Sequence, residues 1–182
     1  MEKSNGSTPE LTTKPVLATP TDLCPEAIVE ISQEMRHLLA DIFVLYVKTK
    51  NFHWHMSGRH FRDYHLLLDQ HAQDIFAMTD EVAERVRKIG GTTLHSIEDI
   101  TRFQRLKNNN QDFVPPEEMV AELCADNQNL VRLMRATHEV CDRHNDVATA
   151  SLLENWIDQG ETRTWFLFEI KGVSTPIPYA DG

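Results

Sequence analysis

Residues 28–47 read IVEISQEMRHLLADIFVLYV, and this stretch decides the fold class. Its apolar side chains recur at intervals of three and four residues, which is the period of an amphipathic α-helix and not of a strand. The pattern predicts a helix from about Pro25 to His55, ended by Met56-Ser57-Gly58. The apolar positions are Ile28, Ile31, Met35, Leu38, Leu39, Ile42, Leu45 and Val47.

Three further long helices are indicated downstream, at about residues 59–88, 115–144 and 146–171. The first of them is closed by Gly90-Gly91, where a left-handed C-terminal cap costs little. The second begins with two prolines and two glutamates, which suit a first helical turn. A short helix is expected near residues 96–103 in the connection. Four long helices and no strand pattern predict an all-α four-helix bundle, a fold that holds metal sites between its helices.

The composition indicates one folded domain with a tail at each end. We expect a flexible tail at residues 1–24, a four-helix domain at 25–171 and an irregular tail at 172–182. The 182 residues carry 28 acidic and 18 basic side chains, a formal charge of -10. This charge repels nucleic acid and acidic lipid and favours cations.

Several sequence features favour a cytoplasmic protein that does not contact a membrane. No run approaches the roughly 20 apolar residues of a membrane span, and the N-terminus lacks an apolar secretory segment. The three cysteines are odd in number and lack Cys-x-x-Cys spacing, so we interpret them as reduced thiols. They are Cys24, Cys124 and Cys141.

Two pairs of potential metal ligands lie on the second helix. His65 and Asp69 are four residues apart, as are Asp80 and Glu84. At about 100° per residue all four fall within an arc of about 100°, but a rise of about 1.5 Å per residue separates the pairs by about 22 Å. Metal–ligand bonds are only about 2 Å long, so one chain cannot gather both pairs. A twofold dimer with antiparallel second helices could form the site twice, with His53 as a fifth ligand.

Imidazole and carboxylate ligands suit ferrous iron, manganese or zinc, and the lack of thiolate disfavours copper(I) or a closed structural zinc site. Carboxylates can also bridge two ions through a redox change. Acidic residues four apart are, however, common on ordinary solvated helix faces. The spacing alone therefore leaves both interpretations open.

The run Phe52-His53-Trp54-His55-Met56-Ser57-Gly58 closely resembles the Dps miniferritin family (DNA-binding proteins from starved cells). The resemblance continues through residues 61–69 and 80–85 to Gly90-Gly91, and more loosely from about Pro25 to Ile170. It implies a ferritin-like four-helix subunit with a short helix between the second and third helices. Such subunits form hollow dodecamers from twofold dimers, with two irons in each inter-subunit site.

The same resemblance implies a set of metal-binding and catalytic residues. His53, His65 and Asp69 of one chain and Asp80 and Glu84 of its partner would hold the iron. The implied activity is that of a ferroxidase, which oxidises Fe(II), preferably with hydrogen peroxide over dioxygen, and stores ferric oxyhydroxide in the shell. This would protect DNA and the cell from oxidative damage. Trp54 occupies the family position of an aromatic residue near the site, and could equally be a packed interface residue.

The chain departs from the family at two places. His55 replaces a common Asn, and His60 and His71 lie nearby, so these histidines either add metal sites or are surface or hydrogen-bonded residues. Ser151 stands where an aspartate usually lines the pore through which iron enters. Replacement charge could come from three acids that could equally be solvated, namely Asp146, Glu154 and Asp158.

Two alternatives compete with the ferroxidase. One is a nucleoid-associated DNA-binding protein in which iron oxidation is secondary. Relatives bind DNA through lysine-rich tails, whereas the first 24 residues carry only Lys3 and Lys14, so direct DNA binding is disfavoured. The other is a di-metal enzyme with its site inside one bundle, which needs two Glu-x-x-His motifs. Only the Glu34 to His37 segment fits.

Overall fold

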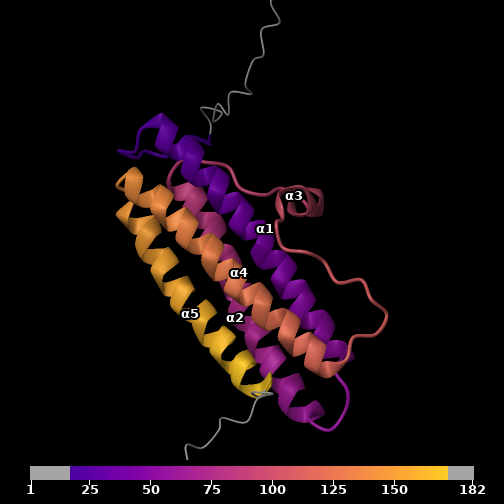
Figure 1. Cartoon of the computed structure of the whole chain (residues 1–182). Helices are drawn as coiled ribbons and strands as arrows, with labels where there is room; N and C mark the ends of the chain where they lie inside the picture. Colours follow the sequence, from indigo (N-terminus) through magenta and orange to yellow (C-terminus); the bar gives the residue numbers. More distant parts are fainter. Residues whose placement is uncertain (1–16, 172–182) are drawn as a thin grey trace, which may run out of the picture.

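A computed structural model describes residues 17–171, and within this range it contains five helices and no strand. The helices are α1 (Pro25–His55), α2 (Phe61–Lys88), α3 (Ile97–Phe103), α4 (Pro116–Arg143) and α5 (Val147–Lys171). The four long helices lie side by side, with α1 and α5 running one way along the bundle and α2 and α4 running the other (Figure 1). The expected all-α four-helix fold with one short additional helix is confirmed.

The helix ends follow local chemistry. Proline stands in the first turn of α1 and of α4, where a missing N–H has no cost. The Ser96 hydroxyl caps α3 by accepting from the Asp99 N–H at 3.3 Å. Gly90 has a φ of 91° immediately after α2, a conformation that side chains with a Cβ rarely adopt. These residues make the connections sharp enough for neighbouring helices to pack.

The core lies between the four long helices and consists mostly of aliphatic side chains with Phe52 and Trp156. Most of the apolar positions expected in the first helix are buried. Ile28 is half-buried, and Val47 has 57% of its surface exposed. Val47 follows Leu45 by two positions, and this spacing turns it by about 200° on a helix, onto the opposite face.

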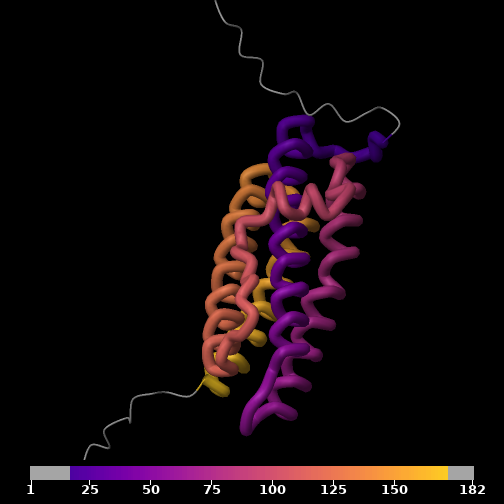
Figure 2. Tube along the Cα trace, turned by 90° about the vertical axis from the view of Figure 1, so that its right-hand side faces the viewer, coloured from indigo at the N-terminus to yellow at the C-terminus, as the bar shows by residue number. Residues whose placement is uncertain are grey.

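The long connection between α2 and α4 runs past the outer side of α1 (Figure 2). The fully buried Asp41 of α1 fixes it there, by accepting from the backbone N–H groups of Arg105 at 2.6 Å and Leu106 at 2.9 Å. Lys48 then joins α1 to α4 through Glu122 and Asp126, at 2.8 and 2.7 Å. Paired in this way, the buried charges are satisfied inside the protein.

Residues 17–24, which we expected to belong to a flexible tail, lie against the end of α2. The Thr19 hydroxyl donates to the Arg87 carbonyl at 2.9 Å, and the Arg87 guanidinium donates to the Leu17 carbonyl at 2.8 Å. The rest of that predicted tail and the predicted C-terminal tail lie outside the described residues. Within residues 17–171, no helix is both long and apolar enough to cross a membrane.

Candidate metal centre

Two histidines meet where α1 ends and α2 begins. The Nδ1 atom of His53 lies 2.8 Å from the His65 carbonyl oxygen, and the Nδ1 atom of His65 lies 2.9 Å from the His53 carbonyl oxygen. Because a carbonyl can only accept, both Nδ1 atoms must carry the proton. The rings are stacked with centroids 3.8 Å apart. In its neutral form each imidazole then has its Nε2 lone pair available, and the ring is held by the kind of backbone contact that orients metal-binding histidines.

Asp69 follows His65 by one helical turn and brings a carboxylate to the same place. Its Oδ1 atom lies 2.8 Å from Lys50 Nζ and 3.9 Å from His53 Nε2, while its Oδ2 atom accepts from Gln73 at 3.0 Å. The hydrogen bond from Lys50 is the main reason that the pKa of Asp69 lies below its ordinary value, and the charge of Lys50 adds to it. The carboxylate is therefore ionised at neutral pH, and a metal ion would compete with Lys50 for it.

Asp80 and Glu84 lie farther along α2, and both are exposed. Glu84 pairs with Lys88 of the next turn, at 3.2 Å across a solvated surface. In residues 17–171 of the single chain, no three His, Cys, Asp or Glu side chains form a group that could hold a metal ion. The structure stacks His53 on His65 and places Asp69 3.9 Å from His53, and it leaves Asp80 and Glu84 farther along α2. The five-residue site stays a prediction about two chains.

Large apolar side chains are exposed on the two helices that carry the candidate ligands. Their exposed fractions range from 45% to 62%. Phe61 stacks on the His65 ring at 5.0 Å between centroids, and Lys50 Nζ lies 5.8 Å from the centroid of the Trp54 ring. Apolar groups gathered beside polar ligands are typical of a surface that another protein covers. We name this set the α1–α2 face: Val47, Trp54, Phe61, Leu66 and Phe76.

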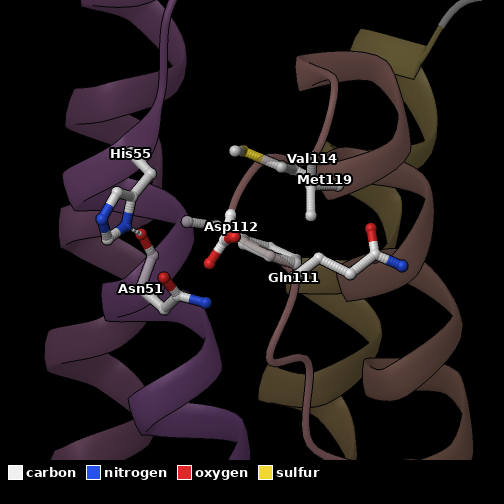
Figure 3. Close-up of a pocket in the computed structure, with 7 residues that line it drawn as sticks. Asn51, His55, Gln111, Asp112, Val114 and Met119 are labelled. Atoms are coloured by element: carbon white, nitrogen blue, oxygen red, sulfur yellow. Dashed lines mark hydrogen bonds between the residues drawn. The ribbon is translucent and has the colours of Figure 1, made fainter.

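The other histidines do not join His53 and His65. His55 lies at a separate pocket of about 190 Å³ between α1 and the segment before α4, and its Nδ1 lies 2.8 Å from the Asn51 carbonyl oxygen (Figure 3). His60 lines a different hollow beside Tyr64. His71 is 5% exposed, and burial together with the charge of Arg163 lowers its pKa to about 4. Each histidine therefore has its own surroundings.

The acids near Ser151 differ in what they contact. Asp146 is 4% exposed, caps α5 by accepting from the Thr149 N–H at 3.0 Å, and pairs with Arg85 at 2.6 Å. It is thus a buried structural carboxylate and not a free replacement charge beside Ser151, which is itself exposed. Glu154 lies 3.2 Å from His138, and Asp158 is exposed.

The Glu34 to His37 segment is not arranged as half of an internal metal site. His37 Nδ1 lies 2.7 Å from the Phe103 carbonyl oxygen, and Glu34 lies 3.5 Å from the Arg105 guanidinium. Both side chains hold the connection against α1. Lys50 and Gln73 contact Asp69 but were not predicted as site residues from the sequence. Lys50 precedes His53 by three residues, and this spacing on a helix could have indicated their shared face.

Comparisons with known proteins agree with this architecture. The family model for the ferritin-like domain matches residues 33–171. A low temperature-induced protein of Nostoc sp. is 35% identical over 130 residues, which cover 71% of this chain and 73% of that protein. DNA protection during starvation protein 1 of Deinococcus radiodurans is 30% identical over 137 residues, 75% of this chain and 66% of that protein.

Among solved structures, DpsC from Streptomyces coelicolor superposes with a TM-score of 0.84 at 25% identity, covering 92% of this chain and 96% of that one. The fold and the helix order therefore place the chain in the class of ferritin-like four-helix proteins. The chain belongs to the Dps family of ferritin-like proteins.

Proposed function

We propose that this protein is a cytoplasmic ferroxidase and iron store, with its two-iron sites at the twofold contacts of a hollow dodecamer. The reciprocal hydrogen bonds of His53 and His65 carry the proposal. They fix the tautomer of both rings and leave two Nε2 atoms free beside the ionised carboxylate of Asp69. A purely structural histidine pair would not need both Nε2 atoms unengaged.

The partner chain would supply what one chain lacks. With α2 of two chains antiparallel, Asp80 and Glu84 of one chain approach His65 and Asp69 of the other, and the twofold axis repeats the site. The same contact would cover the α1–α2 face, whose exposed apolar side chains otherwise remain in water. Assembly and metal binding would therefore depend on the same surface.

The donor set suits iron as the substrate, because neutral imidazole and carboxylate bind ferrous iron and carboxylate also tolerates ferric iron. Two ferrous ions would give one electron each to one hydrogen peroxide, which takes up two protons and leaves as two water molecules. Iron and peroxide would be removed together, and the ferric product would be stored inside the shell. Damage to DNA would fall without direct contact, in keeping with the net charge of -10.

The experiment compares peroxide-driven Fe(II) oxidation by the wild type with that by the Asp80→Ala plus Glu84→Ala variant. We expect at least a hundredfold lower rate, because each site loses its partner carboxylates. Glu139→Ala plus Glu161→Ala removes the same charge from exposed positions of α4 and α5 and is the matched control. An unchanged rate in the first variant, with the control also unchanged, would refute the proposal.

A further inference from the structure

The solvent-facing side of α5 changes character along the helix. From Ser151 to Thr162 every exposed position carries a polar side chain. In the last two turns the exposed positions are mainly aromatic, with exposed fractions of 60% for Trp165, 44% for Phe166 and 52% for Phe168. We name these three residues the α5 aromatic face. A surface helix normally keeps polar side chains on its solvated side, so aromatic rings gathered there indicate a surface that another segment covers.

The three rings adjoin one another, and their hydrogen-bonding needs are met. Trp165 and Phe166 lie edge to face with ring centroids 5.3 Å apart, and Phe168 follows Trp165 by three positions, which makes them neighbours on the helix surface. The Trp165 indole N–H donates to Glu169 Oε1 at 3.1 Å. What remains in water is therefore apolar ring surface, which suits an apolar neighbour.

The twofold contact proposed above does not account for the α5 aromatic face. Phe166 lies edge-on to His71 of α2, with ring centroids 6.4 Å apart. His71 follows His65 by six positions, a turn of about 240°, so it lies outside the arc of about 100° that carries the four candidate ligands of α2. The α5 aromatic face therefore lies on another side of the bundle from those ligands and needs an occupant of its own.

The chain supplies a matching segment immediately after α5. Gly172 follows the last helical residue, and glycine is the residue that most readily lets a chain turn back past a helix end. Next comes the apolar run Pro176-Ile177-Pro178-Tyr179, and Asp181 is the only charged residue in 172–182. Alternating prolines favour the polyproline II conformation, which aromatic-lined surfaces bind at low entropic cost. Residues 1–16, by contrast, contain no aromatic side chain.

The segment is long enough to reach the α5 aromatic face. Trp165 precedes Lys171, the last residue of α5, by six positions, which is about 9 Å along a helix. After a reversal at Gly172, the next four residues span about 12 Å in the polyproline II conformation. This length brings Pro176 level with Trp165, and the rest of the apolar run follows it along the helix.

We propose that residues 173–179 fold back on α5 of their own chain and pack Pro176, Pro178 and Tyr179 against the α5 aromatic face. Burial of these side chains and of the rings beneath them removes apolar surface from water, which stabilises the contact. The segment thereby covers the end of α5 and keeps its aromatic rings from other chains.

Quenching of tryptophan fluorescence by acrylamide tests the proposal in the full-length chain. A Trp54→Phe background leaves two indoles, Trp165 and the buried Trp156, so quenching reports mainly on Trp165. In this background Pro178→Gly plus Tyr179→Ser should raise the quenching constant at least twofold, because the segment no longer packs on the ring.

The matched control makes the same kind of change in the N-terminal segment. Pro15→Gly plus Leu11→Ser should leave the quenching constant unchanged. An unchanged constant in Pro178→Gly plus Tyr179→Ser would overturn the proposal, since either nothing covers Trp165 or a different surface does. An equal rise in the control would overturn it as well.

Disulfide formation identifies which chain supplies the segment. In a background with the exposed Cys24 replaced by serine, Ile177→Cys is combined with Thr162→Cys beside the α5 aromatic face, or with Asn155→Cys as the control. Asn155 lies on the same side of α5, about 10 Å farther from that face. In a glutathione buffer the Thr162→Cys pair should close at least tenfold more favourably, and within one chain on a non-reducing gel. Equal closure of the two pairs, or a linkage between two chains, would overturn the proposal. Neither readout involves iron.

Discussion

The α1–α2 pair and the α4–α5 pair are both antiparallel amphipathic helices. They differ in which polar and apolar side chains lack a partner within the chain at the turn that joins the two helices. Where α4 turns into α5, Asp146 is buried and bonded to Arg85 and Thr149. Where α1 turns into α2, the two histidines keep free Nε2 atoms and the apolar side chains around them are exposed. The buried carboxylate of the α4–α5 turn is satisfied within the chain, whereas we propose that a metal and a partner chain complete the α1–α2 turn.

The largest effect is expected from a substitution at the turn between α1 and α2. His65→Ala removes one Nε2 ligand and also the carbonyl-bound ring that stacks on His53, so we expect at least a hundredfold loss in the rate of Fe(II) oxidation. The free energy of unfolding should change by less than about 1 kcal/mol, since His65 is only half-buried. Stopped-flow absorbance and thermal unfolding measure the two quantities. His60→Ala, which removes an exposed histidine at the same end of α2, should retain the wild-type rate.

The converse substitution is at the turn between α4 and α5. Asp146→Ala removes the α5 cap and leaves Arg85 without its carboxylate partner, so we expect the free energy of unfolding to fall by about 3 kcal/mol. The oxidation rate per folded chain should stay within about twofold of the wild type. Denaturant unfolding measures the first value. Glu154→Ala, which affects only the exposed pair with His138, should cost about 0.5 kcal/mol or less. A greater loss of unfolding free energy in Glu154→Ala would contradict the difference drawn between the buried and the exposed pair.

A smaller effect is expected from a substitution at Lys50, beside the turn between α1 and α2. Lys50→Met removes the main cause of the low Asp69 pKa, so this pKa should rise towards its ordinary value. Asp69 would then protonate at a higher pH as acid is added, and metal binding through it should be lost earlier on acidification. At neutral pH Lys50 no longer competes, so ferrous binding should tighten severalfold. Carboxyl NMR titration and anaerobic Fe(II) titration test both. An unchanged Asp69 titration would contradict this account.

Much of the fold could be predicted from the sequence because helix signals are local. The three- and four-residue apolar period gave α1, and Pro115-Pro116 marked the start of α4. The ionic contacts could not be predicted, since Asp41 meets Arg105 only after the connection has folded back over 64 positions. Asp146 shows the same limit. Its sequence context suits either a solvated acid or a cap, and only the position of Arg85 decides between them.

The candidate site was less fully predictable than the fold. Spacing placed His65 and Asp69 on one helical turn, but it could not show that Lys50 occupies the Asp69 carboxylate or that two carbonyls fix the imidazole tautomers. These contacts join two helices, so neither helix pattern contains them. The contribution of Asp80 and Glu84 from a second chain remains a prediction.

Complementation between inactive chains tests the shared site most directly. His65→Ala and Asp80→Ala plus Glu84→Ala chains are co-expressed, and Fe(II) oxidation by the mixed oligomer is compared with that of each variant alone. Random pairing makes about half of the twofold contacts mixed, and each mixed contact contains one intact site of two, so about a quarter of wild-type activity should return. A mixture as inactive as its parents would show that the five residues do not act across two chains.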